Sequence, residues 1–417
     1  MASVLSVLLL FTIPGCDGTG ENSWSRFRGP NGSGQASGLW AKSAGKHELT
    51  TQWKVELPGK GYSSPIIHAG HIYLQSASTD GRERIVLCLS MKDGTELWRK
   101  TIPGSKAHTH AKNSLASGSA ATDGKLVCFC HWDGKNVILA AYDCADGTPR
   151  WSLSLGAHQS QHGAGYSPIL HQGKVYVAYD NDHQAEVFCV DAASGRKLWS
   201  QKRQHYRASY GTPLIFDNQS VDELIVSSTA GITGYELDSG NKRWHWDWPF
   251  ASKPLRSVSS PLLCGQKILL AAAGDGGGDR DTVAIKLPEG RGEQYQPRLL
   301  WQLRRDVPYV TCLLQQGAHL YAVADKGVAA CYELTTGKEV WSQRLSGNFT
   351  ASPVLVDGVV IAVNEAGELF LFAAQPDKYQ PLFRLKLADT VLSTPAVADG
   401  LLIIRGEQYL HALRAQP

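Results

Sequence analysis

The sequence predicts an all-β fold, an eight-bladed β-propeller of four-stranded antiparallel blades, and three observations support it. One sequence pattern of strands and turns recurs along the chain, and aromatic residues end its copies at a regular spacing. The copies number eight once the two chain ends are paired. A period near 50 residues is the length of one four-stranded blade. Hydrophobic residues at 43% and charged residues at 19% are typical of a globular protein with a large core.

Each copy begins with an apolar segment that carries Ser/Thr-Pro, continues through two strands of alternating polarity, and ends with Gly followed by a Trp strand. The copies end at the following residues: Trp98, Trp151, Trp199, Trp244, Trp301, Trp341 and Phe383. From Trp98 to Trp341 these tryptophans lie 53, 48, 45, 57 and 40 residues apart. Asp-Gly and Ser-Gly pairs before them supply the positive φ that tight turns need.

The count of strands predicts how the ring closes. The innermost strands are expected to begin near Ser63, Ser117, Tyr166, Gly211, Ser259, Thr311, Ser352 and Thr394. Seven outermost strands follow them, and residues 51–55 have the pattern of an eighth with no blade before it. We expect 51–55 to join the last blade beside 409–413, which leaves no open sheet edge. Residues 50–417 are therefore predicted to form one propeller domain.

The N-terminus has the pattern of an export signal over residues 1–16. Its ten-residue apolar run, Val4 to Ile13, suits a signal peptide and is too short to span a bilayer. Ile13-Pro14-Gly15-Cys16 is similar to a bacterial lipobox, which implies lipidation of Cys16. The chain departs from that pattern at Pro14 and in having no Lys or Arg before the apolar run. A cleaved secretory signal and a buried N-terminal strand are the alternatives.

Residues 17–49 are rich in Gly, Ser and Asn and are expected to form a flexible tether between the lipid and the propeller. These features together predict an exported protein of the periplasm or cell envelope. Contact with the membrane is expected only through the lipid anchor.

The repeat resembles a known family. Ser-x-Pro, Gly-x-x-Tyr-x, Ala/Cys-x-Asp and Gly-x-x-x-Trp, in this order over about residues 50–414, resemble the pyrroloquinoline-quinone (PQQ) type, quinoprotein dehydrogenase-like propeller repeat. The size and the lipobox are similar to BamB-type outer-membrane assembly lipoproteins. Residues 24–32 and 110–117 resemble secreted bacterial PQQ-binding-like propellers, and this group is the better match, because BamB-type partner-binding residues cannot be mapped here.

The resemblance implies a test for enzymatic function. PQQ dehydrogenases use a vicinal disulfide, carboxylates on Ca²⁺ and an Asp base, and no two cysteines of this chain are adjacent. No catalytic residue can therefore be assigned. We expect a non-catalytic envelope scaffold that binds a protein or ligand and needs no cofactor. The alternative is a PQQ-dependent dehydrogenase that oxidises an alcohol or sugar with PQQ and calcium.

The cysteines are interpreted as packing residues. Cys88, Cys189 and Cys331 each lie six residues before a turn glycine, and sister blades have Ala or Gly in that position, which indicates a slot for a small buried residue. Cys128, Cys130 and the neighbouring His131 leave a metal pair as an alternative, although no second Cys/His pair accompanies them.

A binding site is expected where polar loops converge. The connections between blades and the loops between second and third strands share one face of a propeller, and sites on such folds belong to loops. The candidate ligand-binding residues at the channel mouth on this face are His110, Asn113, His162, Asp180 and Arg203. They suit a small anionic or polyhydroxylated ligand. Solvation of ordinary loops, and mutual pairing of Asp180 with Arg203, are the alternatives.

Two further patterns have functional and structural interpretations. Asp275, Asp279 and Asp281 leave a Ca²⁺ site open, without EF-hand spacing. Trp246 and Trp248 fit either a stacking platform for a sugar or quinone or, more simply, packing at the rim of the blade. The net charge of +3, without a basic block, gives no support to nucleic-acid binding. We expect a monomeric propeller whose partner is another envelope protein.

Overall fold

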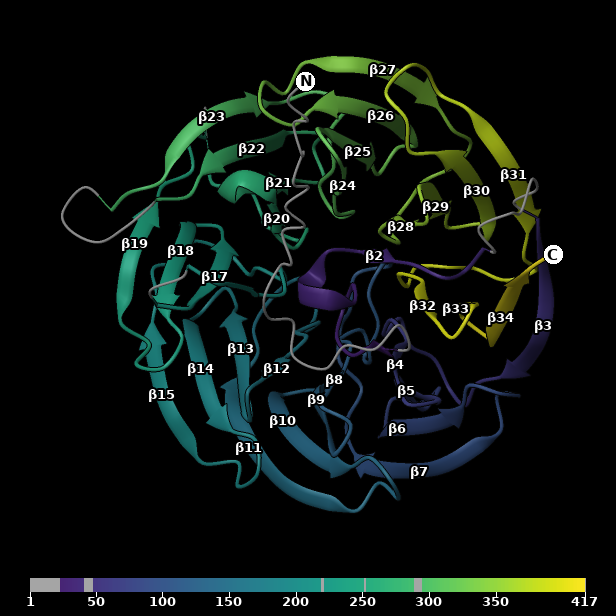
Figure 1. Cartoon of the computed structure of the whole chain (residues 1–417). Helices are drawn as coiled ribbons and strands as arrows, with labels where there is room; N and C mark the ends of the chain where they lie inside the picture. Colours follow the sequence, from purple (N-terminus) through teal and green to yellow (C-terminus); the bar gives the residue numbers. More distant parts are fainter. Residues whose placement is uncertain (1–22, 41–47, 219–220, 251–252, 289–294, 417) are drawn as a thin grey trace, which may run out of the picture.

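The computed structural model describes residues 23–40, 48–218, 221–250, 253–288 and 295–416. They form eight antiparallel blades of four strands around a common axis, as Figure 1 shows looking along that axis. The prediction of an all-β, eight-bladed propeller is confirmed. Within these residues, no helix is long and apolar enough to cross a membrane. The predicted leader, with Cys16, lies outside the described residues.

The innermost strands are short and follow the Ser/Thr-Pro segments by a few residues. They are β4 (Ile66–His68), β8 (Ala121–Thr122), β12 (Ile169–His171), β16 (Leu214–Phe216), β20 (Leu262–Cys264), β24 (Leu314–Gln316), β28 (Val354–Val356) and β32 (Ala396–Ala398). The predicted starts were two to four residues early, because the Ser/Thr-Pro segment approaches the axis before the ladder begins.

The second and third strands carry most of the core. The second strands are β5 (His71–Ala77), β9 (Leu126–Trp132), β13 (Lys174–Asp180), β17 (Glu223–Ser228), β21 (Ile268–Gly274), β25 (His319–Val323), β29 (Val359–Val363) and β33 (Leu401–Arg405). The third strands are β6 (Glu83–Ser90), β10 (Asn136–Asp143), β14 (Ala185–Asp191), β18 (Gly231–Glu236), β22 (Arg280–Lys286), β26 (Val328–Glu333), β30 (Glu368–Ala373) and β34 (Tyr409–Ala415). Both faces of these strands are buried, because each blade packs against its two neighbours.

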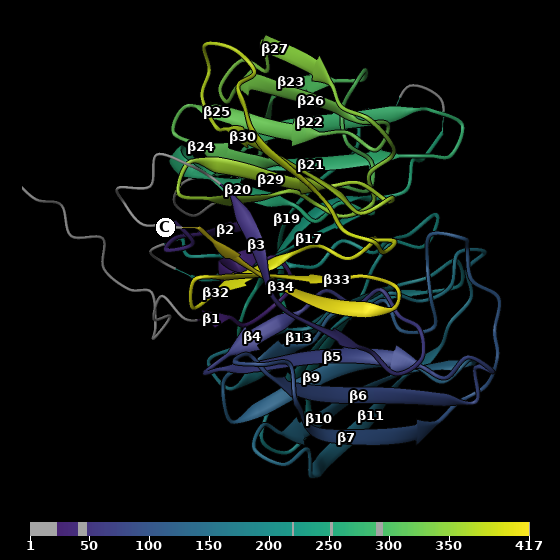
Figure 2. The same cartoon turned by 90° about the vertical axis from the view of Figure 1, so that its right-hand side faces the viewer.

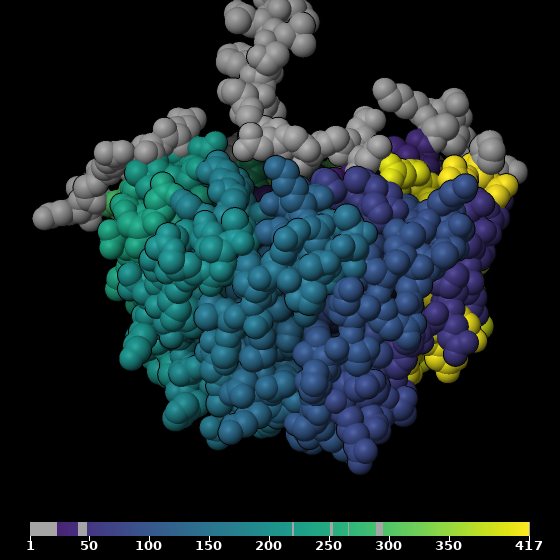
Figure 3. Space-filling model, turned by 90° about the horizontal axis from the view of Figure 1, so that it is seen from below, coloured from purple at the N-terminus to yellow at the C-terminus, as the bar shows by residue number. Residues whose placement is uncertain are grey.

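The outermost strands alternate between exposed and half-buried residues and form the wall of the drum seen from the side in Figure 3. They are β7 (Glu96–Pro103), β11 (Pro149–Ala157), β15 (Lys197–Lys202), β19 (Lys242–Trp246), β23 (Arg298–Leu303), β27 (Glu339–Arg344), β31 (Pro381–Lys386) and, for the last blade, β3 (Leu49–Glu56). Strand β3 pairs with β34 in antiparallel register, from Leu49 opposite Ala415 to Glu56 opposite Tyr409. The predicted closure of the ring is therefore confirmed.

A second ring of hydrogen bonds runs around the axis. The backbone N–H of Ser64 donates to the Ser119 hydroxyl of the next blade at 2.9 Å, and the Thr394 N–H closes the ring onto the Ser64 hydroxyl at 3.0 Å. Equivalent bonds join four further pairs of neighbouring blades through Ser or Thr hydroxyls, and a fifth through Cys312 Sγ. The residue at this position, a Ser or Thr before proline in most blades, thus links its blade to the preceding one.

The blade tryptophans join neighbours at the outer wall. Trp98 donates its indole N–H to the Cys144 carbonyl of the next blade at 3.0 Å, and Trp53, Trp151, Trp199, Trp301 and Trp341 repeat this contact. Gly147 lies beneath the Trp98 ring, with φ of 70° and no room for a Cβ, which would come within 2.6 Å of the indole. This contact is why the motif requires glycine and tryptophan together.

The position six residues before the turn glycine requires a small residue because of the same tryptophan. Cys88 is the cross-strand partner of Trp98, as are Cys189 of Trp199 and Cys331 of Trp341. Sister blades place Ala141, Gly234 and Ala284 opposite their tryptophans. A bulky side chain there would collide with the indole, so these six blades, which end in tryptophan, keep a small residue. All eight cysteines among the described residues are buried and free of disulfides.

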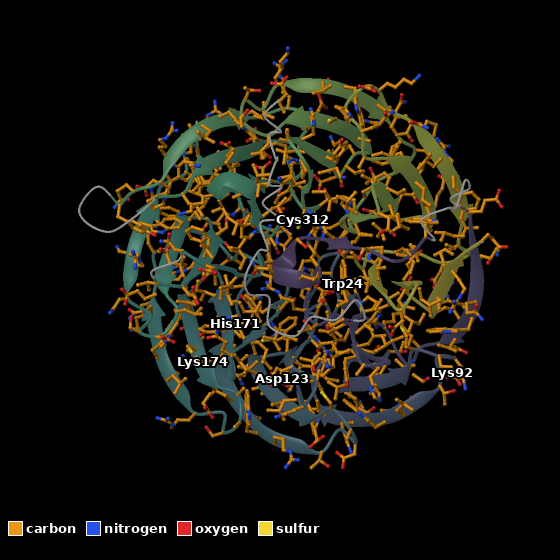
Figure 4. All side chains as sticks on the ribbon, in the orientation of Figure 1. Trp24, Lys92, Asp123, His171, Lys174 and Cys312 are labelled. Carbon is orange, nitrogen blue, oxygen red and sulfur yellow. The ribbon has the colours of Figure 1, made fainter. Side chains whose placement is uncertain are left out.

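The prediction of a flexible tether over 17–49 is wrong for residues 23–40. Strand β1 (Ser23–Trp24) pairs with β4, η1 (Pro30–Gly32) lies near the axis, and β2 (Gln35–Ala36) pairs in parallel with β28. We call residues 23–36 the plug. It lies at the centre of the face turned toward the viewer in Figure 1, where Figure 4 labels Trp24, and toward one end of the drum in Figure 2.

Two buried arginines hold the plug against the ring. Arg28 is 1% exposed and donates to the Leu313 carbonyl at 2.8 Å and the Pro353 carbonyl at 3.0 Å. Arg26, also buried, donates to the Pro213 carbonyl of the fourth blade. These acceptors belong to three blades, so the plug ties together strands that are distant in sequence. Sequence periodicity could not reveal contacts between an irregular segment and carbonyls nearly 200 to 325 residues away.

The axial hydroxyl ring predicts a specific loss of stability. Replacing Thr394 by Val keeps the shape of the side chain but leaves the buried Ser352 N–H without its acceptor. The free energy of unfolding should fall by about 1–3 kcal/mol, the cost of an unsatisfied buried donor. Thr51→Val, on the exposed face of β3, is the matched control and should change it by less than about 0.5 kcal/mol. Equal denaturant midpoints for the two variants would show that the ring does not contribute.

Candidate functional site

The face opposite the plug is formed by connections that run from one blade to the next. We call it the loop face, and it includes residues 104–120, 158–168 and 203–213. Each of these connections starts after an outermost strand and leads to the innermost strand of the following blade, while the plug pairs with the far ends of innermost strands. Together they carry four Lys or Arg residues and five His residues with no Asp or Glu, namely Lys106, His108, His110, Lys112, His158, His162, Arg203, His205 and Arg207.

Three of the five predicted site residues lie together on this face. The imidazoles of His110 and His162 are stacked, with ring centroids 5.0 Å apart and 26° between their planes. Asn113 donates from Nδ2 to the His162 carbonyl at 2.7 Å and to the Ala164 carbonyl at 3.2 Å. Asn113 thus fixes the backbone of the neighbouring connection. Its amide supports the two imidazoles and does not face outward as a ligand group.

The other two predicted residues are paired with each other. Arg203 Nη2 donates to Asp180 Oδ2 at 2.8 Å, and both side chains are buried. Burial raises the pKa of Asp180, and the nearby Arg203 opposes that shift. Asp180 and Arg203 both belong to the third blade, one at the end of β13 and the other just beyond β15. The structure therefore shows the mutual pairing that the sequence left as an alternative.

Arg256 is the residue at this site that the predicted set omitted. It comes from the connection between the fourth and fifth blades, is 3% exposed, and places Nη1 2.8 and 3.1 Å from the two ring nitrogens of His162. Its Nε donates to the Ala208 carbonyl, and its backbone pairs with Gly274. We call His110, His162 and Arg256 the central cluster. The sequence shows Arg256 as one of several loop arginines, and only the path of its connection distinguishes it.

The environment keeps the half-buried His162 imidazole neutral. Burial and then the nearby Arg256, His110 and Arg207, in that order, together lower the pKa of His162 to about 4. An uncharged ring can accept a hydrogen bond from the Arg256 guanidinium through a ring nitrogen without a proton. The nearest carboxylate to Arg256 that forms an ion pair is Asp182, at 4.0 Å from Nη2.

A salt bridge connects two further connections on this face. Lys112 Nζ lies 2.6 Å from Glu365 Oε1, which also accepts from the Thr350 hydroxyl at 2.7 Å. Lys112 lies between the first and second blades, whereas Glu365 lies in the seventh, so the long connection 104–120 extends beyond its own blades. Its length is used to cover part of the loop face.

The acidic residues considered as a Ca²⁺ site are held by cations. Lys253 Nζ lies 2.5 Å from Asp275 and 3.5 Å from Asp279, while Asp281 accepts from Gln302 at 2.7 Å and lies 3.8 Å from Arg304. Within the described residues, no three His, Cys, Asp or Glu side chains are grouped to hold a metal. These carboxylates therefore join residues of the loop face to one another.

The pair of cysteines with His131 does not form a metal site either. Cys128 and Cys130 face the core between the second and third blades, and His131 alternates to the other face of β9. There it lines a hollow of about 470 Å³ on the side of the drum between the first and second blades, with Asp133 and Trp151. A second hollow, of about 400 Å³, lies on the outer wall beside Arg304 and Tyr332. Neither hollow is lined by His110, His162 or Arg256.

The tryptophan series packs into the blade. Trp248 is 8% exposed, donates its indole N–H to the Ser228 carbonyl at 2.7 Å, and stacks on Phe250 at 5.2 Å. Trp246 is half-buried against Trp248. With its ring covered and its N–H bonded, Trp248 cannot serve as an open platform for a sugar or quinone.

The residues of the loop face do not fit a quinone–calcium cofactor. The acids that could ligate calcium near the axis are already engaged: Asp180 with Arg203, Glu365 with Lys112, and Asp325 with two backbone N–H groups and Arg280. The sequence also lacks the adjacent cysteines that support the quinone ring in the dehydrogenases it resembles.

Comparisons with known proteins agree with this fold. A family model described as "Outer membrane protein assembly factor BamB" matches residues 134–292 and 298–375, more than half of the chain. The outer membrane protein assembly factor BamB of Nitrosomonas eutropha is 20% identical over 307 residues, which cover 65% of this chain and 71% of the relative.

Solved structures with similar folds belong to two groups. BamB from Moraxella catarrhalis superposes with a TM-score of 0.62 at 16% identity, covering 88% of this chain and 98% of the other. A europium-containing methanol dehydrogenase gives 0.71 at 11% identity, covering 95% and 98%. The quinohemoprotein alcohol dehydrogenase from Comamonas testosteroni gives 0.70 at 11% identity, covering 94% and 80%. At these identities the superpositions show the shared propeller fold.

The buried His131 predicts a dependence of stability on pH. Burial lowers its pKa to about 4 from the usual 6.5, so the unfolded chain binds this proton more readily than the folded one. Its contribution to the free energy of unfolding is complete above pH 6.5 and falls by about 3 kcal/mol as the pH drops to 4. In His131→Leu this contribution should be absent, so the wild type should lose about 3 kcal/mol more than the variant between pH 7 and pH 4, measured by denaturant unfolding. Parallel pH curves would contradict a neutral, buried imidazole.

Proposed function

This chain belongs to the family described as outer membrane protein assembly factor BamB, and from that premise we propose that it is a non-catalytic scaffold of the cell envelope that binds a protein partner through its loop face. The observation that carries the proposal is the difference between the two faces. The plug covers the centre of one face, while three neighbouring connections on the other carry nine basic or imidazole side chains and no acid.

The architecture supports a rigid binding surface. The connections of the loop face are fixed by the Asp180–Arg203 pair, the Lys112–Glu365 pair and the Asn113 amide. Preorganised side chains lose little conformational entropy when a partner binds. Tyr206, 53% exposed among these basic residues, is the aromatic side chain best placed to act as an anchor.

The predicted lipid anchor gives this arrangement a direction. Six residues separate Cys16 from Ser23, the first residue of the plug. Even a fully extended chain would span at most about 25 Å from Cys16 to Ser23. A lipid on Cys16 would therefore hold the plug face close to the bilayer and turn the loop face toward the envelope space. We propose that export and lipidation present the loop face to its partner in this way.

The second candidate function is a PQQ-dependent oxidation of an alcohol or sugar. The observation that favours it is the superposition on two dehydrogenases over at least 94% of this chain. The engaged acids of the loop face count against it. Dye-linked turnover of alcohols or sugars by the purified chain, after loading with PQQ and Ca²⁺, would overturn the scaffold in favour of this function.

The scaffold is tested by capture of outer-membrane β-barrel proteins or their assembly factors from envelope extracts. Tyr206→Ala should weaken the captured complex about tenfold, since loss of an interfacial aromatic anchor costs about 1–2 kcal/mol. Leu97→Ala, which removes a similarly exposed apolar side chain from the outer wall, should leave capture unchanged. Equal loss of capture in both variants, or capture that neither substitution changes, would contradict binding at Tyr206. The partner would then bind another surface, or there would be no specific partner.

The anchor is tested by Cys16→Ser. If Cys16 carries the lipid, the variant should move from the membrane fraction to the soluble envelope fraction, while its unfolding midpoint stays that of the wild type. Fractionation followed by immunoblotting measures the shift. A variant that remains with the membrane would contradict the lipid anchor and favour retention through a partner.

A further inference from the structure

We propose that the central cluster, with Arg207 beside it, is an oxyanion site that takes one carboxylate or phosphate group from the loop-face side. The proposal concerns a chemical class of ligand and rests on the proposed function only in taking the loop face as the open one. It assigns a role to Arg256 and Arg207, neither of which the fold requires for its repeat motifs.

The first argument is the state of the Arg256 guanidinium. Its side chain is almost wholly buried, yet the groups that it bonds are neutral: the His162 ring, the Ala208 carbonyl and the Tyr309 side chain. Asp182 is 4.0 Å from Nη2, and its Oδ1 already accepts the Ala208 N–H at 2.7 Å. A buried cation without a directly bonded carboxylate is costly, and an oxyanion at hydrogen-bond distance would offset that cost.

The second argument is convergence. Arg256 and Arg207 come from two successive connections and both affect the same two groups. Each lowers the pKa of His162, and each opposes the effect of burial on the pKa of Tyr309. Arg256 also donates from Nε to the carbonyl of Ala208, the residue next to Arg207, so the two arginines lie in a common region of the loop face. His110 reaches this region from a third connection through its stack on His162.

The third argument is the local charge balance. The other charges on neighbouring elements are already paired: Lys112 with Glu365, Arg203 with Asp180, and Arg280 with Asp325. Around the central cluster this leaves two guanidiniums against the single carboxylate of Asp182. The planar N–H fork of arginine matches carboxylate and phosphate oxygens in a bidentate manner. A monovalent or divalent oxyanion fits this excess, whereas a cation does not.

The same group can be supplied by a free small molecule or by an acidic side chain of a protein partner. Binding of three probes to the purified full chain, measured by isothermal titration calorimetry at low salt, distinguishes them. The probes are inorganic phosphate, citrate and a hexaglutamate peptide. Binding of phosphate or citrate supports a free anion, and binding of the peptide alone supports an acidic segment of a partner.

The variants decide whether the site is the one described. Arg256→Gln should weaken binding at least tenfold, and Arg207→Gln, a partly exposed residue whose loss should not disturb folding, about three- to tenfold. Arg305→Gln removes an exposed arginine on another connection of the same face and should leave affinity unchanged. No binding of any probe by the wild type, or equal affinities in Arg207→Gln and Arg305→Gln, would overturn the site.

These outcomes are separable from those of the capture experiment, which measures a partner and not an anion. If the chain captures no partner but still binds phosphate, the scaffold proposal is refuted and the oxyanion site is supported. Capture that persists while no probe binds would keep the scaffold and refute the site.

Discussion

The hydrogen bonds from backbone N–H groups to the Ser and Thr side chains of the next blade are the contact on which the rest of the structure depends. They set the distance between innermost strands at the axis, where the blades are narrowest, while the tryptophan contacts set it at the wall. With both distances fixed, each blade buries the two faces of its middle strands. A buried N–H must find an acceptor, and a side chain of the neighbouring blade supplies one without any additional backbone. Cys312 occupies one position in this ring, and its sulfur accepts the Ser260 N–H at 3.3 Å.

The fold could be predicted because these contacts recur. Most blades repeat the Ser/Thr before proline, the turn glycine and the tryptophan, so spacing alone shows the number of blades and the closing strand. The plug has no such repetition. Arg26 and Arg28 lie in a stretch rich in Gly and Ser that looks like a linker, and their acceptors are backbone carbonyls, which carry no sequence signal. Composition predicts flexibility there, whereas long-range hydrogen bonds and the burial of Trp24 impose order.

The candidate site could be predicted in part for a related reason. The repeat determines which loops share a face, and this places His110 and His162 together correctly. It does not determine how far each connection extends over the face. Arg256 reaches His162 from two blades away, whereas Asp180 and Arg203 turn toward each other within one blade. Predicting these partners requires the path of the connections, which vary in length from blade to blade.

The pairing of acids on the loop face argues against a quinone–calcium centre in this propeller. A quinone–calcium centre requires carboxylates left free to ligate a metal, and here Asp180, Asp325 and Glu365 are each consumed by an arginine, a lysine or backbone N–H groups. Pairing these acids leaves the loop face with an excess of arginine and imidazole, which reverses its preference from a cation to an anion. Since the plug occupies the other face, any partner that exploits this excess must approach from the loop face. The same ring of hydroxyls and tryptophans can therefore support a site for a cation or a site for an anion. Which of the two it supports depends on whether the acidic residues of the loops are free or paired.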